Sequence, residues 1–297
     1  MELAPNPAHR FPVSSAQNLI NGSSFTALPH NGASTQAEWQ HYSLIAYAVP
    51  TARVEHLVPA GFELETFSLN DQPGHQPTSR ALISVESFLD NGSGFRFGDC
   101  ASFEQTKYRL YVRRQGKSGT WLLGTSVGSL TAVAPRHLWS LPWHLSAMEF
   151  QVAYDPAEGR YHDYRLQTSS QWANATWEIR DTGVPMDFDQ DFASLVPQLP
   201  FSLRASTDWF HRRDGTPGEY RVTRADAHFT RGQLTFARCE LLEKTGLLTR
   251  AELMQPFLVA LQHRVNAQIH APVAAPQTSP IFNHAVSGSV NGVAVIC

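Results

Sequence analysis

The sequence lacks long apolar runs, an excess of basic charge and paired cysteines, and each absence excludes a class of protein. No stretch approaches the roughly 18 uninterrupted apolar residues of a spanning helix, and no charged start followed by an apolar run marks a secretory leader. Because Lys and Arg (23) do not outnumber Asp and Glu (26), we expect no nucleic-acid partner and no membrane contact. Three distant cysteines form neither a disulfide framework nor a metal knuckle (Cys100, Cys239, Cys297). We therefore expect a reduced, cytoplasmic protein.

Motifs for common cofactors and catalytic centres are also missing. The sequence contains no G-x-x-x-x-G-K-[ST], no strand-linked G-x-G-x-x-G, no H-E-x-x-H and no G-x-S-x-G. Among the histidines, His137 and His144 are the pair nearest to a candidate site, and no third ligand follows at a useful spacing. We expect neither a cofactor nor a metal ion.

The composition is that of a folded protein with one sizeable core. Hydrophobic residues make up 42%, aromatic residues 11% and charged residues 16% of the 297 residues, which excludes global disorder. Residues 1–37 are rich in Pro, Asn, Ser, Gly and His and predict a flexible arm, and residues 271–297 predict a tail of similar bias. No linker interrupts the chain between them, so residues 38–270 are expected to form a single domain.

This domain is predicted to consist mostly of β-strands joined by short turns. Residues 103–113 alternate as one long strand, and the Gly-containing turn at 115–119 leads into a second strand at 120–125, which indicates a hairpin. Further strands are expected at 44–49, 81–89, 150–154, 161–167, 172–179, 220–223 and 234–241. Strands at such short spacing favour an antiparallel barrel or a strongly curved sheet.

One long helix is predicted near the end of the domain. Thr249 and Glu252 have the spacing of a capping box, and the apolar residues that follow recur every four positions (Leu253, Phe257, Leu261, Val265). Pro256 is expected to kink this helix in its first turn. A short helix is also expected at 51–57.

Polar side chains on the strand at 103–113 point to a site. Alternation places Gln105, Lys107, Arg109 and Tyr111 on one face of this strand. In an open sheet that face meets solvent, whereas in a closed barrel it lines a ligand cavity. A second segment, 135–144, is expected to place bulky groups at the mouth of that cavity.

Three segments in this order resemble an uncharacterised bacterial family of the acetoacetate decarboxylase-like superfamily. They are LIAYAVPTARVEHLVPAGFELETF at 44–67, the R-L-Y-V strand at 109–112, and A-P-R-H-L-W-S-L-P-W-H at 134–144. The resemblance covers roughly residues 40–248. It implies an α+β fold: a mostly antiparallel, cone-shaped β-barrel with a few peripheral helices and a buried central cavity.

The resemblance also implies a chemistry from which this sequence departs. Acetoacetate decarboxylase forms a Schiff base between a lysine and the ketone of a β-keto acid, and the iminium accepts the electrons left by departing CO₂. Matching that motif places Trp143 and His144 on its two lysine positions and Arg136 on its arginine, and neither Trp nor His forms an iminium. The family's strand glutamate matches Gln105 or, with a slip of one residue, Glu104.

Two residues of the strand are the leading candidates for function. Lys107 is predicted to be a relocated amine nucleophile whose pKa is lowered by burial and by Arg109, and the alternative is a lysine exposed on the strand. Arg109 is predicted to bind a substrate carboxylate, and the alternative is an internal ion pair with Glu86 or Glu104.

The remaining candidates would surround the substrate. His144 is a predicted proton donor. The predicted substrate-binding residues are Gln105, Tyr111, Arg136 and Trp143.

The expected function is that of a small-molecule enzyme acting on a keto acid or another carbonyl substrate. The reaction would be a decarboxylation, an aldol reaction or a dehydration, carried out without the usual Schiff-base lysine. The alternative is a non-catalytic cavity protein that binds a small organic acid or an apolar metabolite. The partner is a small molecule in both cases, and a homo-oligomer is left open.

Overall fold

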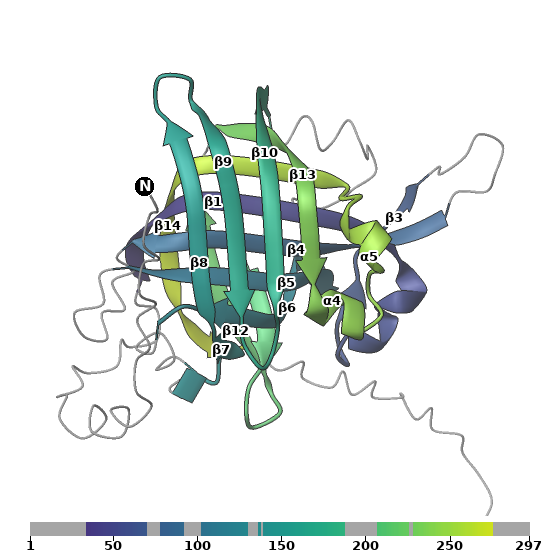
Figure 1. Cartoon of the computed structure of the whole chain (residues 1–297). Helices are drawn as coiled ribbons and strands as arrows, with labels where there is room; N and C mark the ends of the chain where they lie inside the picture. The colour runs from purple at the N-terminus through teal and green to yellow at the C-terminus, as the bar shows by residue number, and fades with distance from the viewer. Residues whose placement is uncertain are drawn as a thin grey trace, which may run out of the picture.

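A computed structural model of the chain shows a β-barrel with a second sheet laid across it (Figure 1). The structure describes residues 34–69, 78–91, 102–129, 136–137, 139–187, 207–225 and 228–275. Within these ranges, no helix has the length and apolar character needed to cross a membrane.

Strands dominate the described chain. They are β1 (Ser34–Pro50), β2 (Glu63–Leu64), β3 (Thr66–Leu69), β4 (Thr78–Asn91), β5 (Ser102–Arg114), β6 (Lys117–Val127), β7 (Trp143–Leu145), β8 (Ala147–Asp155), β9 (Arg160–Ser169), β10 (Ala175–Met186), β11 (Thr207–His211), β12 (Pro217–Arg224), β13 (Phe229–Cys239) and β14 (Leu258–Ala274). The helical elements are short: η2 (Thr51–Arg53), η3 (Glu55–Leu57), α4 (Glu240–Lys244) and α5 (Arg250–Leu253).

Seven strands close into the barrel. Their order is β1-β4-β5-β6-β11-β12-β14, and β14 returns to pair with β1, from Ser34 opposite His270 to Ala46 opposite Leu258. The pairs are antiparallel except for the short parallel pair β6–β11. The prediction of a mostly antiparallel β-barrel with few peripheral helices is confirmed.

The second sheet branches from the barrel at β14. That strand also pairs with β13, and the sheet continues through β10 and β9 to β8. In Figure 1 these four strands run across β1, β4 and β5 in front of the barrel. The sheet covers the outer face of β5, where Tyr108, Leu110 and Val112 join an apolar cluster that includes Tyr164 and Trp177. Strand β5 is therefore buried on both faces.

The hairpin β5–β6 is formed as predicted. Its turn consists of Gln115 and Gly116, both with positive φ (52° and 76°), as in the two-residue turns whose twist matches that of antiparallel strands. Gly119 follows where a Cβ atom would lie 2.5 Å from the ring of Trp209. The local sequence therefore sets the register that places the polar face of β5.

The long helix predicted from Thr249 onward is wrong beyond its first turn. The capping box between Thr249 and Glu252 is present, but α5 ends at Leu253. Pro256 lacks the backbone N–H that a continuing helix needs. The last two residues of the supposed stripe, Leu261 and Val265, lie in β14 and pair with β1. The helix expected at 51–57 is replaced by two short 3-10 turns.

The terminal arms lie largely outside the described residues. Residues 1–33 and 276–297 are not described, whereas residues 34–37 form the start of β1 and residues 271–274 the end of β14. The domain boundaries at 38 and 270 stay predictions.

Candidate active site in the barrel interior

The polar face of β5 lies inside the barrel. Gln105, Lys107, Arg109 and Tyr111 are at most 2% exposed. Lys107 Nζ lies 3.7 Å from Asp208 Oδ2 on β11, although the described strands that pair with β5 are β4, β6 and the short β2. This contact therefore crosses the interior of the barrel, and alternation places the other three side chains on the same face.

Glu86 of β4 is the central carboxylate of this interior. Its Oε1 accepts hydrogen bonds from Tyr42 Oη and Arg224 Nη2, both at 2.6 Å. Its Oε2 lies 3.1 Å from Arg109 Nη1 and 3.8 Å from Lys107 Nζ. Burial alone would raise the pKa of Glu86, but Arg109, Arg224 and Lys107 lower it to about 2. Glu86 is therefore ionised at neutral pH.

Asp208 of β11 provides a second carboxylate beside the same cations. Its Oδ1 accepts a hydrogen bond from Thr120 Oγ1 and lies 3.9 Å from Arg109 Nη1. Since Oδ2 of Asp208 and Oε2 of Glu86 both approach Lys107, the ammonium lies between two carboxylates. These two groups compensate charge that burial would otherwise make very costly.

Lys107 is held in an unusual environment for a lysine. Its Nζ lies 5.0, 5.4 and 5.1 Å from the ring centroids of Trp39, Phe88 and Tyr220. Among the described residues no group forms a hydrogen bond with Nζ. Burial lowers the pKa of Lys107, and the attraction of Asp208 and Glu86 only partly opposes it. The neutral, nucleophilic amine is thus more accessible than in an exposed lysine.

Arg109 is fully buried and keeps its charge. Its Nε donates to Ser84 Oγ at 3.2 Å. Burial by itself would lower the pKa of Arg109, but the nearby Glu86 raises it. The ion pair with Glu86, one of the alternatives that the sequence leaves open, is present. Within the described part of the chain, Nη2 has no hydrogen-bond acceptor, so the guanidinium retains a donor for a carboxylate.

The register of β5 places Gln105, and not Glu104, in this interior. Gln105 Nε2 donates to Asp90 Oδ2 at 3.1 Å, whereas Glu104 lies against Gly128 and is partly exposed. Tyr111 is completely buried, and burial raises the pKa of its hydroxyl.

The segment around β7 divides the other predicted site residues between two sides of the barrel wall. Trp143 belongs to the interior apolar cluster, and the centroid of its ring lies 6.2 Å from that of Phe103. The ring of the next residue, His144, stacks on that of Trp172 with 4.2 Å between the ring centroids. Trp172 in turn makes an edge-on ring contact with Tyr108 on the outer face of β5. Burial lowers the pKa of His144, with a further effect of Arg136, which is itself exposed. The structure thus brings neither His144 nor Arg136 together with Lys107.

Sequence reasoning missed several members of this interior cluster. Glu86 entered only as a partner of Arg109, although one carboxylate within the apolar run at 81–89 was a usable signal. Asp208 lies in β11, a strand of five residues that alternation did not predict. The other members that were missed are Trp39, Tyr42, Phe88, Tyr220 and Arg224.

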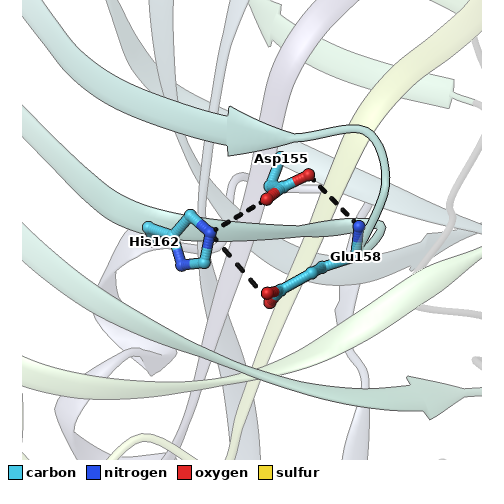
Figure 2. Close-up of side chains that lie close together, drawn as sticks. All are labelled: Asp155, Glu158 and His162. Carbon is cyan, nitrogen blue, oxygen red and sulfur yellow. Dashed lines mark hydrogen bonds and ion pairs between the residues drawn. The ribbon is translucent and has the colours of Figure 1, made fainter.

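One group outside the barrel has the spacing of metal ligands among the described residues, and its atoms already stabilise a turn. Asp155, Glu158 and His162 lie at the β8–β9 hairpin (Figure 2). Asp155 Oδ1 accepts the backbone N–H of Ala157 and of Glu158, and Asp155 Oδ2 lies 3.2 Å from His162 Nε2. These contacts lower the pKa of Asp155 and account for the cluster without an ion.

Comparisons with known proteins agree with this architecture. The DUF2071 family, described as an uncharacterized conserved protein, matches residues 36–264. No match is found among curated proteins.

Solved structures share the fold at low sequence identity. Acetoacetate decarboxylase from Legionella pneumophila is similar with a TM-score of 0.53 and 12% identity, covering 92% of this chain and 98% of that chain. An acetoacetate decarboxylase-like enzyme from Sphingomonas wittichii RW1 is similar with a TM-score of 0.54 and 10% identity, and the match covers 86% of this chain and 99% of that enzyme. A third similar structure is the enduracididine biosynthesis enzyme MppR, complexed with the condensation product of pyruvate and imidazole 4-carboxaldehyde. Its TM-score is 0.50 at 12% identity, and the match covers 86% of this chain and 92% of MppR. These likenesses show the fold.

Proposed function

Because the chain belongs to the DUF2071 family and shares the fold of acetoacetate decarboxylase-like enzymes, we propose that it is an enzyme acting on a keto acid or another carbonyl compound. The observation that carries the proposal is Lys107, a buried lysine with a lowered pKa inside the barrel. Arg109, buried beside it with an unfilled donor among the described residues, suits the carboxylate of such a substrate. The neighbour MppR, captured with a condensation product of pyruvate, supports a carbonyl substrate class.

The proposed chemistry runs through an imine on Lys107. The neutral amine adds to the carbonyl carbon and its nitrogen passes one proton to the carbonyl oxygen; with a second proton from solvent this oxygen leaves as water, and an iminium remains. This cation withdraws electrons from the adjacent carbon, which permits decarboxylation, aldol or dehydration chemistry. Glu86 and Asp208 flank Nζ and stabilise the positive charge at the iminium as they do at the ammonium.

The roles of the other predicted residues follow from their positions. Gln105 and Tyr111 share the interior face with Lys107 and would contact the substrate, and Trp143 would form part of the apolar wall. His144 and Arg136 lie away from Nζ, so this mechanism gives them no part in the chemical step.

Reductive trapping tests the proposal. The chain contains three lysines, Lys107, Lys117 and Lys244, and the last two have side chains that are 45% and 75% exposed. Incubation of the full chain with acetoacetate or pyruvate and borohydride should give one adduct, which peptide mapping locates on Lys107. Lys107→Arg, which keeps the charge, should abolish the adduct, and Lys244→Arg should not. An adduct confined to the exposed lysines contradicts the proposal.

The alternative function is a non-catalytic barrel that binds a small organic acid. It is favoured by the ion pairs of Lys107 with Glu86 and Asp208, which oppose loss of the amine's proton, while Arg109 Nη2 still lacks an acceptor among the described residues. Saturable binding of a carboxylate by the wild-type chain, weakened in Arg109→Gln and accompanied by no adduct on Lys107, would establish this function instead.

A further inference from the structure

Closure of the barrel leaves the main sheet with a free edge at β8. Strand β1 pairs with both β4 and β14, but at the other end of the strand order β8 pairs with β9 only. No described strand pairs with the opposite side of β8. Figure 1 shows β8 as the outermost strand of the second sheet. Its backbone N–H and C=O groups on that side are available for a further strand.

The sequence of β8 does not protect this edge. Sheet edges that must avoid pairing carry Pro, Lys, bulges or very few residues. Strand β8 has nine residues, AMEFQVAYD, without Pro, Gly or Lys. A register irregularity occurs at Ala153 and Tyr154, near its end. The exposed face carries one charged side chain before the last residue, Glu149.

The inward face of β8 has apolar surface left to bury. Met148, Phe150, Val152 and Tyr154 pack against the cluster between barrel and sheet, but all four are partly exposed. On β9 the inward residues are nearly inaccessible, as in Leu166 with 1% exposure. The apolar layer between the sheets therefore continues to the edge and is open there.

We propose that β8 pairs antiparallel with β8 of a second copy of this chain, with the two-fold axis at Gln151. Gln151 is the middle residue of the strand, so this register pairs all of it. Glu149 then lies opposite Ala153 of the other copy, and Asp155 opposite Ala147, so no like charges face one another. On the inward face Phe150 meets Val152 and Met148 meets Tyr154, the apolar pairing that stabilises antiparallel strands. The two outer sheets become one continuous sheet.

Introducing a charge at the axis tests this interface. Gln151 is exposed, so Gln151→Lys and Gln151→Glu each place like charges across the two-fold axis without altering the core. Because like charges directly opposite destabilise a sheet by about 0.2–1 kcal/mol, each variant should dimerise up to about fivefold more weakly in sedimentation velocity. A mixture of the two variants should restore the dimer as a heterodimer. Gln167→Lys, the same change on the exposed face of β9, is the control and should dimerise like wild type.

Oxidative cross-linking tests the register. Residues opposite one another in antiparallel strands have Cα atoms about 4.5–5.5 Å apart, within the range that a disulfide spans. Gln151→Cys should form a covalent dimer on oxidation, and Gln167→Cys should remain monomeric on a denaturing gel. A wild-type chain that stays monomeric at all concentrations overturns the proposal. So does a dimer insensitive to both charge variants and not cross-linked by Gln151→Cys. Neither result depends on activity.

Discussion

At the scale of single residues, the barrel interior is governed by one carboxylate shared among three cations. Glu86 contacts Lys107, Arg109 and Arg224 and holds the hydroxyl of Tyr42. Because all five groups are buried, each depends on the others for compensation. The polarity of this interior is therefore a property of the cluster, and one substitution affects every member.

Replacement of Glu86 should expose this dependence. Glu86→Gln leaves Lys107, Arg109 and Arg224 buried with less negative charge, so the free energy of unfolding should fall by about 3–5 kcal/mol. Urea denaturation followed by far-UV circular dichroism measures it. Glu149→Gln removes an exposed carboxylate on β8 and should change stability by no more than about 0.5 kcal/mol. Equal effects of the two variants would contradict a central role for Glu86.

The interior face of β5 was predictable, and Glu86 was named as one possible partner of Arg109, but the contact with Asp208 was not predictable. Alternation alone grouped Gln105, Lys107, Arg109 and Tyr111, because a strand places every second side chain on one face. Asp208 lies 101 residues after Lys107 in the chain, and its proximity arises from barrel closure, which no local pattern encodes. The side of the barrel wall on which His144 lies was not predictable for the same reason, since it depends on the register between β7 and β6.

At the scale of secondary-structure elements, turn and cap chemistry predicted better than apolar periodicity. The hairpin turn at Gln115–Gly116 and the capping box at Thr249 are both present. The four-residue apolar repeat after Thr249 suggested a long helix, but its last two members, Leu261 and Val265, lie in β14 and are buried in the outer and the interior apolar cluster, respectively. Residues 258–261 of β14 form an apolar run buried on both faces, and so short an apolar run fits a helical repeat as readily as a strand.

The capping box should stabilise the short helix α5 measurably. Thr249 Oγ1 accepts from the backbone N–H of Glu252, whose side chain also pairs with Arg53 at 2.8 Å. Thr249→Ala removes the cap and should lower the free energy of unfolding by about 1 kcal/mol. Thr249→Ser retains the hydroxyl and should stay close to wild type in the same denaturation experiment. A loss of stability as large in the serine variant would assign the effect to packing of the methyl group.

At the scale of the whole molecule, the outer sheet is attached to the barrel through a junction that contains two histidines. His41 on β1 and His263 on β14 lie with ring centroids 5.5 Å apart, and the hairpin β8–β9 covers them. Tyr161 Oη is 3.2 Å from His41 Nδ1, and Tyr154 stacks on His263 at 3.8 Å. Protonating either imidazole places positive charge in a partly buried junction beside the other histidine.

Stability should therefore fall in mild acid. Burial, with smaller effects of His263 and Arg264, lowers the pKa of His41 from 6.5 to about 4, so the folded state binds fewer protons than the unfolded state below pH 6.5. The stabilising contribution is complete above pH 6.5 and is lost as pH falls toward 4. Thermal melts across this range should show a decline that His41→Gln reduces, whereas His162→Gln, at the exposed hairpin turn, should retain it. An identical decline in His41→Gln would assign the acid sensitivity to other groups.

The central claim is that the amine of Lys107 loses its proton more readily than an ordinary lysine. With three lysines in the chain, labelling all of them with ¹⁵N and ¹³C gives three side-chain signals, and Lys107→Arg identifies the one of interest. The account predicts that burial makes Lys107 titrate below the ordinary range of a lysine side chain. Titration of Lys107 within or above that range would contradict it.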